Sequence, residues 1–485
     1  MLLSELLKKI EYIECLGFEE CEIVGVTERS GNVSEGFVFV AVEGNFENGE
    51  RYINVAYERG AFATVVSSPK RKTHYKNTII AENPRKCEAE IAKAIWGENV
   101  GKIKIIGITG TKGKTTTAKI LAECIAHLGL GCVSIGTLGV EYYCGKKRVF
   151  LTGTAENTTP DAPFIYKALS DAYGEGVRVG VIEVSSQALM NYRVFGIPFT
   201  VCVFTNFSHD HVGSLEHKSV GEYLDAKRSL FCDYGAKICI VNSDDESSRL
   251  ISGGIDHVID FGNESKSFKL SVSLSDESHS EFTINGNSFS LSLGGDFNAY
   301  NAAAAVVTAS MLFARDVSEF FSVLESISVP GRYEVYKIKD KTVIIDFAHN
   351  GESFRSVITS AKKSRRGKVI TLFGSVGERS HGRRAELAIV AEELSDFIVL
   401  TADNPGCESA EDICEEIASY MIDRSCVKIV PDRREAIKFA LDVASDGDVV
   451  LLLGKGHENY QLVGKNKIPF SEREIIESLG ALRIT

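Results

Sequence analysis

A glycine-rich loop between an apolar strand and a helix constrains the fold of this chain more than any other segment. The run KIKIIGIT (102–109) is apolar and rich in β-branched residues, as a buried strand is. GTKGKTTT (110–117) follows it, and a helical pattern begins at about Thr115. A strand, a glycine-rich loop and a helix in this order begin a unit of parallel strands joined by a helix. The backbone N–H groups of such a loop are suited to hold phosphate groups.

The loop departs by one residue from the strict phosphate-loop pattern, which is a glycine, four residues and then Gly-Lys-Ser/Thr. Counted back from Gly113, the pattern would have its first glycine at Ile108, and Gly107 is one residue too far. A glycine-rich turn without a ligand is therefore the alternative interpretation. Because a strand and a helix flank the loop, we expect a variant phosphate loop. In it, Lys114 would reach the β/γ oxygens and Thr115 would bind Mg²⁺.

The pattern along the chain divides it into three regions. A length of 485 residues corresponds to about three domains at ~150 residues each. The regions that we distinguish are 1–98, 99–330 and 331–485. In the first, apolar runs at 36–44 and 60–68 are separated by a helical segment and bounded by Gly and Asn turns, which predicts a small α/β domain.

Strands that end in polar clusters recur through the second and third regions. Ligands bind at the carboxyl ends of the strands in open α/β sheets, so these polar ends are candidate sites. Between them, 266–293 alternates polar and apolar residues, with a hairpin turn predicted at Asn285-Gly286. The run 299–314 predicts a small-residue helix, and 329–331 is the candidate linker. The strand-like runs lie at 177–184, 199–206, 341–350, 367–378, 396–406 and 447–458.

Composition excludes several classes of protein. The formal net charge of −12 argues against nucleic-acid binding, although an acidic chain can still hold a local anion site. No apolar run reaches the ~18 residues of a membrane span. The first 18 residues carry charges throughout and predict an amphipathic helix rather than a signal peptide. The twelve cysteines form no C-x-x-C pair and are expected to be reduced, as in a cytoplasmic protein.

Ordered motifs along nearly the whole chain resemble those of the Mur ligase family, the cytoplasmic ATP-dependent peptide synthetases of peptidoglycan assembly. The phosphate loop is similar to the family's TGTNGKTT, with Lys112 in place of Asn. The similar segments are TGTKGKTT (109–116), EVSSQAL (183–189), TNFSHDHVG (205–213), EYLDAKRSLF (222–231), GDFNAYNAAAA (295–305), PGR (330–332), DFAHN (346–350), DNPG (403–406) and GKGHE (454–458).

The resemblance implies an α/β fold of three domains. They would be a small N-terminal UDP-binding domain (1–98), a central phosphate-loop ATPase domain with a parallel sheet (99–330), and a Rossmann-like amino-acid-binding domain (331–485). DNPG and GKGHE resemble the members that add the third amino acid to UDP-N-acetylmuramoyl-L-alanyl-D-glutamate through an acyl-phosphate. We therefore expect ATP and Mg²⁺ as cofactors. The expected partners are UDP-MurNAc-dipeptide and a diamino acid, and the expected state is a cytoplasmic monomer.

The resemblance also implies roles for the polar strand ends. Glu183 and His211 would bind Mg²⁺ together with Thr115. Lys227 belongs to the apolar stripe of its helix and should point inward, where an ammonium is costly. In the family this lysine is carbamylated and binds a second Mg²⁺; a lysine that reaches solvent is the alternative. The expected catalytic residues are Lys114, His211, Lys227 and His349, and the expected nucleotide contacts are Gly110, Thr111, Lys112, Gly113, Lys114, Thr115, Thr116, Asn301, Arg332 and Asp346.

The segments that are expected to bind the UDP-sugar and the amino acid differ more from the family's motifs than the ATP-binding segments do. Arg29 and Gly31 stand where the family has Asp and Arg, on either side of Ser30. By the resemblance, Arg379 and Glu458 hold the α-carboxylate and α-ammonium of the amino acid. Gly406 replaces the arginine that grips the distal carboxylate of diaminopimelate, which favours L-lysine over meso-diaminopimelate, with Arg383 or Arg384 as possible substitutes. The expected substrate contacts are Ser30, Asn157, Thr158, Thr159, Ser185, Arg193, Arg379, Asp403, Asn404, Gly406, Gly454 and Glu458.

Three other functions remain to be weighed. A folylpolyglutamate or polyglutamate synthetase would share much of the pattern, but GKGHE and the N-terminal region argue against it. A non-catalytic paralog that binds UDP-sugar peptide fits the substitutions near Ser30, but it would not need Lys227 and a second metal. A P-loop GTPase is disfavoured because the chain has no NKxD base-reading motif.

Overall fold

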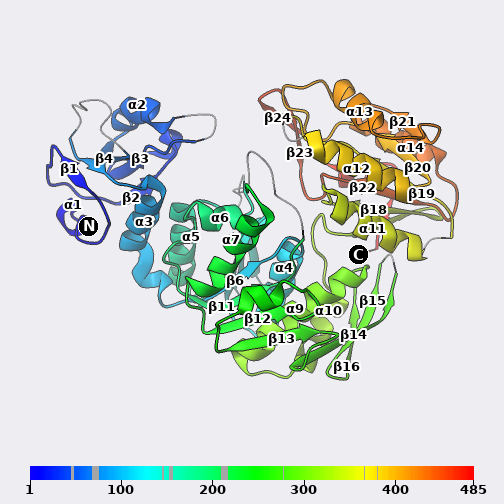
Figure 1. Cartoon of the computed structure of the whole chain (residues 1–485), viewed down its shortest axis with the longest axis horizontal. Coiled ribbons are helices and arrows are strands. Elements are labelled where there is room, and N and C mark those ends of the chain that lie inside the picture. Colours follow the sequence, from blue (N-terminus) through cyan, green and yellow to red (C-terminus); the bar gives the residue numbers. More distant parts are fainter. Residues whose placement is uncertain are drawn as a thin grey trace. The chain divides into compact units, whose positions relative to one another are not determined.

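The computed structural model describes residues 1–44, 48–67, 76–144, 147–151, 157–208, 217–276, 278–364, 366–378 and 381–484. The chain packs into two compact units, Met1–Asp260 and Phe261–Thr485 (Figure 1). Its strands form three sheets accompanied by helices and one separate hairpin, which confirms the α/β class. The division into three domains at 98/99 and 330/331 stays a prediction.

The first sheet has the strand order β1-β5-β4-β3-β2. The structure corrects the prediction of an amphipathic helix over the first 18 residues. Helix α1 contains only four residues, and the segment after it, β1, pairs with β5 at the edge of this sheet. Glu14 lies opposite Ile80, and the N–H of Ile13 donates to the Ile80 carbonyl at 2.7 Å. The apolar residues here therefore serve a sheet edge. The elements are α1 (Leu3–Leu6), β1 (Glu14–Leu16), β2 (Gly25–Thr27), β3 (Phe37–Val40), α2 (Ile53–Glu58), β4 (Ala61–Val66), β5 (Thr78–Ile80) and α3 (Pro84–Val100).

The predicted phosphate loop follows β6 in the second sheet. This strand is the middle one of five parallel strands, which lie in the order β12, β11, β6, β10 and β7. Strands β8 and β9 continue the sheet antiparallel. The elements are β6 (Lys104–Thr109), α4 (Lys114–His127), β7 (Cys132–Gly136), β8 (Gly139–Cys144), β9 (Lys147–Leu151), α5 (Ala162–Gly174), β10 (Val179–Glu183), α6 (Ser186–Met190), β11 (Phe199–Phe204), α7 (Val220–Cys232), β12 (Ile238–Asn242), α8 (Ser248–Ser252) and β13 (Val258–Gly262).

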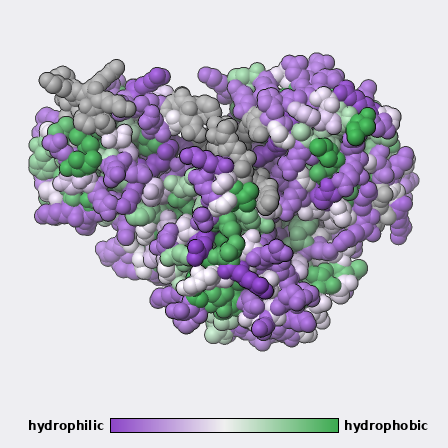
Figure 2. Space-filling model, viewed as in Figure 1, coloured by the Kyte–Doolittle hydropathy of each residue, from purple (hydrophilic) through white to green (hydrophobic). Residues whose placement is uncertain are grey.

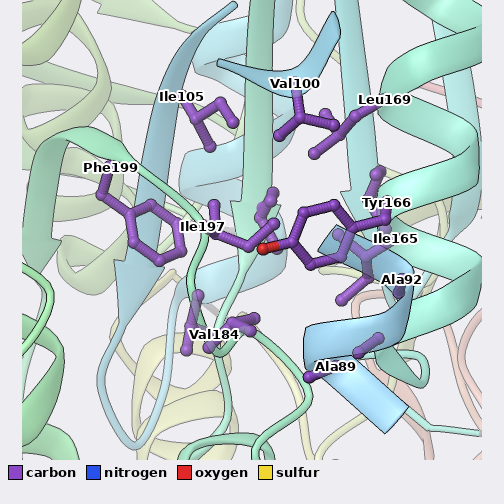
Figure 3. Close-up of a cluster of buried hydrophobic side chains, with 14 of the residues drawn as sticks. Ala89, Ala92, Val100, Ile105, Ile165, Tyr166, Leu169, Val184, Ile197 and Phe199 are labelled. Carbon is purple, nitrogen blue, oxygen red and sulfur yellow. The ribbon is translucent and has the colours of Figure 1, made fainter. Parts of the chain in front are cut away.

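Helices α3 and α5 pack together on one side of this sheet. Figure 3 shows Ala89 and Ala92 of α3 beside Ile165 and Tyr166 of α5, all of them buried. The Tyr166 hydroxyl donates to the Phe195 carbonyl at 2.9 Å, so the polar end of this buried ring is satisfied. This apolar layer fixes the strands whose carboxyl ends carry the candidate site.

In the second unit, an antiparallel meander packs against a helix of small residues. The hairpin predicted at Asn285-Gly286 is confirmed, since both residues have positive φ (48° and 83°), as a type I′ turn requires. The small-residue helix is also confirmed, because alanines of α9 are buried against β14 and β15. The elements are β14 (Phe268–Ser275), β15 (Ser280–Ile284), β16 (Asn287–Leu291), α9 (Asp296–Phe313) and α10 (Phe321–Glu325).

The third sheet has the order β21-β20-β19-β22-β18-β17-β25, and its inner strands from β21 to β18 are parallel. A separate hairpin, β23–β24, follows β22. The elements are β17 (Glu334–Ile338), β18 (Lys341–Asp346), α11 (Gly351–Ser364), β19 (Val369–Phe373), α12 (His381–Leu394), β20 (Phe397–Leu400), α13 (Ala410–Ser419), β21 (Val427–Ile429), α14 (Arg433–Val443), β22 (Val449–Leu453), β23 (Tyr460–Val463), β24 (Asn466–Pro469), α15 (Glu472–Ser478) and β25 (Leu482–Arg483).

A buried ion pair joins α14 to α15 in this unit. The Arg433 guanidinium donates to Glu472 Oε1 at 2.8 and 2.9 Å and to the carbonyls of Ala402 and Leu453. We expect Arg433→Ala to lower the free energy of unfolding by ~3–5 kcal/mol, because the Glu472 carboxylate stays buried without its partner. Urea titration measures this loss, and Arg434→Ala, at the exposed neighbouring position, is the matched control. Equal midpoints for the two variants would contradict the expectation.

The helices and the surface shown in Figure 2 bear on whether the chain could span a membrane. Figure 2 shows one face of the molecule, on which hydrophilic residues predominate and apolar residues lie in separate spots. Over the part of the chain that the structure describes, no helix is both long and apolar enough to cross a bilayer.

Candidate functional site

The glycine-rich loop is held by the end of β11. The N–H of Lys112 donates to Asn206 Oδ1 at 2.8 Å, and the Thr205 hydroxyl donates to the Lys112 carbonyl at 2.6 Å. Gly110 has φ +149°, and a Cβ there would lie 1.9 Å from Thr205 Oγ1, so only glycine fits. Gly107 is a packing residue inside β6, since its Cβ would lie 2.8 Å from the Phe199 ring. Gly107 is thus not part of the phosphate loop, and its one-residue offset from the strict phosphate-loop pattern leaves the loop residues unaffected.

Lys114 begins helix α4 and folds back over the loop. Its ammonium donates to the carbonyls of Gly110 at 2.8 Å and Thr111 at 3.1 Å. Gly113, the N-cap of α4, has φ +83°, which directs the chain into the helix. The loop thus combines a helix N-terminus, backbone N–H groups and a lysine, which together suit a polyphosphate.

A carboxylate lies directly beside the first turn of α4. Glu183, at the end of β10, is 2% exposed. Its Oε2 accepts hydrogen bonds from the hydroxyls of Thr115 (2.8 Å) and Thr137 (3.0 Å), and its Oε1 accepts one from the Thr137 N–H (2.9 Å). A Cβ at Gly136 would lie 2.1 Å from Glu183 Oε1, so a glycine is required there. Thr115, Gly136 and Glu183 line one small pocket together with Lys119 and Glu141.

The donor set in this pocket fits a hard cation. Hydroxyl and carboxylate oxygens are the ligands that Mg²⁺ prefers, usually together with phosphate oxygens and water. Within the described residues, no three His, Cys, Asp or Glu side chains converge as a metal-binding group. A Mg²⁺ ion at this place would therefore be held by Thr115, Glu183 and a bound polyphosphate. The predicted third ligand, His211, lies outside the described residues.

Lys227 points inward, as its helical position predicts. Its side chain is 1% exposed, and its ammonium donates to the Gly110 carbonyl at 2.9 Å. The same ammonium lies 4.3 Å from the centre of the Tyr223 ring, whose hydroxyl donates to Thr111 Oγ1 at 3.1 Å. The lysine that snorkels to solvent is therefore excluded, and helix α7 brings Lys227 to the phosphate loop.

Three predicted substrate residues meet at the ends of β10 and α6. The Thr159 hydroxyl donates to the Glu183 carbonyl at 2.7 Å and accepts from the Ser185 N–H at 3.0 Å. Arg193 donates to the Thr159 carbonyl at 2.9 Å. Asn157 and Thr158 precede this cluster in a bend and are more exposed. Ser30 lies in a 3-10 turn, where its carbonyl accepts from Arg59 at 3.4 Å.

An acidic and basic cluster beside Arg193 was not predicted from the sequence. Burial raises the pKa of Glu88, with Glu28 and Asp161 adding to the shift. Burial also raises the pKa of Glu28 and lowers the pKa of Arg193. Arg29 stands where the family has Asp, and its Nε lies 3.9 Å from Asp161 Oδ2. The only sequence signal near this cluster was Arg29, whose charge is opposite to that of the family's Asp.

Among the predicted nucleotide residues of the second unit, Asp346 is buried at the end of β18. Its carboxylate accepts from the N–H groups of Tyr333 (2.7 Å) and Ala348 (2.6 Å), and burial raises its pKa although Arg332 opposes this. The Arg332 guanidinium lies over the Phe347 ring at 4.5 Å. The ring nitrogen Nδ1 of His349 lies 2.8 Å from the Phe347 carbonyl, and Asn301 lies on α9, where it donates to Asn298 at 3.2 Å.

Lys455 joins the two motifs of the predicted amino-acid site, and sequence reasoning missed it. Its fully buried ammonium donates to Glu458 Oε2 at 2.8 Å and to Asn404 Oδ1 at 3.1 Å, and it lies 3.8 Å from Asp403 Oδ1. The Asn404 amide also donates to Glu458 Oε2 at 2.9 Å. A Cβ at Gly454 would lie 2.8 Å from Asp403 Oδ2. DNPG and GKGHE therefore form one network, while Arg379 lies outside the described residues.

Comparisons with known proteins agree with this geometry. The family model for the Mur ligase middle domain matches residues 108–309, and the one for the Mur ligase glutamate ligase domain matches residues 331–456. A UDP-N-acetylmuramoyl-L-alanyl-D-glutamate--2,6-diaminopimelate ligase of Aquifex aeolicus is 35% identical, over 96% of this chain and 95% of the relative. An enzyme of that name from Caldanaerobacter subterraneus subsp. tengcongensis is 32% identical over 99% of both chains.

Solved structures give the same result for the fold. The structure of a ligase with that name has a TM-score of 0.63 and 26% identity, covering 94% of each chain. Folylpolyglutamate synthase of Mycobacterium tuberculosis has a TM-score of 0.62 at 16% identity and covers 77% of this chain, which is a likeness of fold alone. Together with the phosphate loop that faces Glu183 and Lys227, the near-full-length relatives show that this chain belongs to the Mur ligase family.

Proposed function

We propose that this chain is the ATP-dependent ligase that adds meso-2,6-diaminopimelate, the third residue, to UDP-N-acetylmuramoyl-L-alanyl-D-glutamate. The observation that carries the proposal is the match over nearly the full length to relatives with that printed activity. Their names favour diaminopimelate over the L-lysine expected from Gly406. The extent of the match, which includes the N-terminal region, also favours this activity over a folylpolyglutamate synthetase.

In the first step, an oxygen of the substrate carboxylate attacks the γ-phosphorus of ATP. A new P–O bond forms, the bond to the bridging oxygen breaks, and ADP leaves with that electron pair. Lys114 and the N–H groups at the start of α4 stabilise the charge on the transferring group. Thr115 and Glu183 would hold a Mg²⁺ ion, which when bound would supply further positive charge at these oxygens.

In the second step, the amine of the amino acid attacks the acyl-phosphate carbon. The tetrahedral intermediate collapses with loss of inorganic phosphate, and the proton that the amine loses leaves on that phosphate as HPO₄²⁻. Glu458 and Asn404, held by Lys455, bind the ammonium group and orient the incoming amino acid. Thr159, Ser185 and Arg193 hold the peptide end of the UDP-sugar substrate.

We also propose that Lys227 is carbamylated. The ammonium would first lose a proton. The neutral amine would then attack CO₂, forming an N–C bond while one C=O π bond opens onto oxygen, and a second proton would leave, so that a buried cation becomes an anion. Support comes from its position, since its ammonium meets the loop carbonyl that Lys114 also contacts. Two ammonium groups at one carbonyl repel each other, and a carbamate would remove this repulsion and add a carboxylate-like ligand for a cation.

Competition between two amino acids tests the proposed function. With UDP-MurNAc-dipeptide, ATP and Mg²⁺ present, we expect the product mass to correspond to diaminopimelate addition when meso-diaminopimelate and L-lysine are equimolar. A charge-assisted contact with the distal carboxylate corresponds to ~10–150-fold in affinity. A lysine product would contradict the specificity but not the ligase reaction. Binding of the UDP-sugar peptide without any product would instead favour the non-catalytic paralog.

A further inference from the structure

Selection of diaminopimelate requires a cation at the distal end of the amino-acid site; this inference rests on the proposed function. Both diamino acids carry an α-carboxylate, an α-ammonium and a distal ammonium. Only diaminopimelate has a distal carboxylate, so no contact to the other three groups separates the two substrates. A charge-assisted hydrogen bond to that carboxylate is the physical means of discrimination.

The loop that would carry such a cation ends in a residue without a side chain. Gly406 has φ +61°, and a Cβ there would lie 2.8 Å from Glu378 Oε2. Its N–H donates to the Leu462 carbonyl at 3.1 Å, and its carbonyl accepts from the Gly464 N–H at 2.7 Å. Hairpin β23–β24 therefore docks on this loop through the backbone of Gly406, which places hairpin side chains beside the amino-acid site.

Two buried cations near the loop are already neutralised. The Arg384 guanidinium, 2% exposed, donates to Glu408 at 2.7 Å and also to Glu416. Lys455 is bound to Glu458 and Asn404. A cation that is buried and paired on several sides is a poor receptor for another carboxylate, because the existing bonds would have to break. Arg384, a candidate from the sequence, therefore serves to hold Glu408.

The hairpin offers a cation of a different kind. Lys467 lies opposite Leu462, whose N–H and carbonyl point away to Asn404 and Gly406, so the side chains of this cross-strand pair are close. The Lys467 side chain is exposed, and its ammonium lies 4.6 Å from the centre of the Tyr460 ring. Lys455 contacts the same ring at 5.7 Å. The ring thus links the ammonium that holds Glu458 to the lysine of the hairpin.

We propose that Lys467 binds the distal carboxylate of diaminopimelate and thereby determines the amino-acid specificity of this chain. The cation–π contact with Tyr460 holds the ammonium near the site at little cost. The long, flexible side chain allows the ammonium to turn toward a bound carboxylate. Glu378, at the Gly406 turn, is placed to meet the distal ammonium. The distal zwitterion would then face a lysine and a glutamate.

Selectivity kinetics test this assignment. We expect Lys467→Met to lower kcat/KM for meso-diaminopimelate ~10–150-fold, mainly through KM, with KM for the UDP-sugar substrate and kcat/KM for L-lysine unchanged. Lys467→Arg should retain most of the preference for diaminopimelate. Lys465→Met, at an exposed lysine of the same hairpin, is the matched control and should resemble the wild type.

The outcomes separate this inference from the proposed function. If Lys467→Met keeps the wild-type ratio of diaminopimelate to lysine, the assignment is overturned while the ligase stands. An equal loss for both amino acids would also overturn it, because that result indicates a structural role of the hairpin. If the wild-type protein itself uses L-lysine and not diaminopimelate, both the proposed specificity and the role of Lys467 are wrong.

Discussion

Replacing Lys114 by alanine is expected to reduce kcat for ligation by about 10²–10³-fold or more. The loop places this ammonium within hydrogen-bonding distance of two loop carbonyls, at the N-terminus of α4. When a phosphoryl group is transferred, the negative charge on its oxygens is stabilised by fixed cations and N–H groups more than by acid–base catalysis. Phosphate release with all substrates present measures the effect.

The fold should survive this change, because the hydrogen bonds described for the Lys114 ammonium are with carbonyls of the loop itself and not with the apolar core. Lys102→Ala, at an exposed lysine that pairs with the exposed Glu98, is the control for loss of a positive charge in the same unit. Phosphate release from the wild type should also require both the UDP-sugar peptide and an amino acid. Rapid ATP hydrolysis without the UDP-sugar, or wild-type turnover by Lys114→Ala, would contradict the assignment of the loop.

Local sequence patterns predicted the elements that carry the site. The strand before the loop, the helix after it and the hairpin turn at Asn285-Gly286 depend on periodicity and turn chemistry, which are local properties. The prediction of an N-terminal helix was wrong. The apolar residues of this segment fit a helical pattern and a strand pattern, and the pairing of Glu14 with Ile80 of β5 favours the strand. That contact joins residues far apart in the chain, and no local pattern reports it.

The residues of the candidate site also fall into those that local sequence patterns predict and those that depend on contacts between distant parts of the chain. Sequence motifs predicted Thr115 and Glu183, and both a motif and its position on a helix predicted Lys227. Lys455 and Glu88 were not predicted, because their importance comes from burial beside partners distant in sequence. Gly406 favoured L-lysine, whereas the names of the relatives favour diaminopimelate. A missing arginine on one loop does not report the side chains of a hairpin that docks on that loop. Amino-acid specificity was therefore the property that local sequence patterns could predict least.

Lys227→Ala is expected to be nearly inactive, with a loss on the order of 10²-fold or more in kcat, although the chain still folds. Truncation removes the group that would become a carboxylate-like metal ligand beside the Gly110 carbonyl. Because the space left by the side chain adjoins the phosphate loop, short carboxylates such as acetate should partly restore phosphate release. Arg228→Ala, one residue further along the same helix, is the matched control.

Two measurements distinguish a carbamate from an ordinary ammonium. ¹³C-labelled CO₂ should give a carbamate resonance in the wild type that is absent from Lys227→Ala. Lys227→Glu, which supplies a carboxylate without CO₂, should keep more activity than Lys227→Met, which keeps the length of the side chain but no charge. If the ammonium itself were needed, Lys227→Arg would be the better replacement, and added carboxylates would not restore activity. Full activity of Lys227→Ala would remove both roles, because neither an ammonium nor a carbamate could then be essential at the loop.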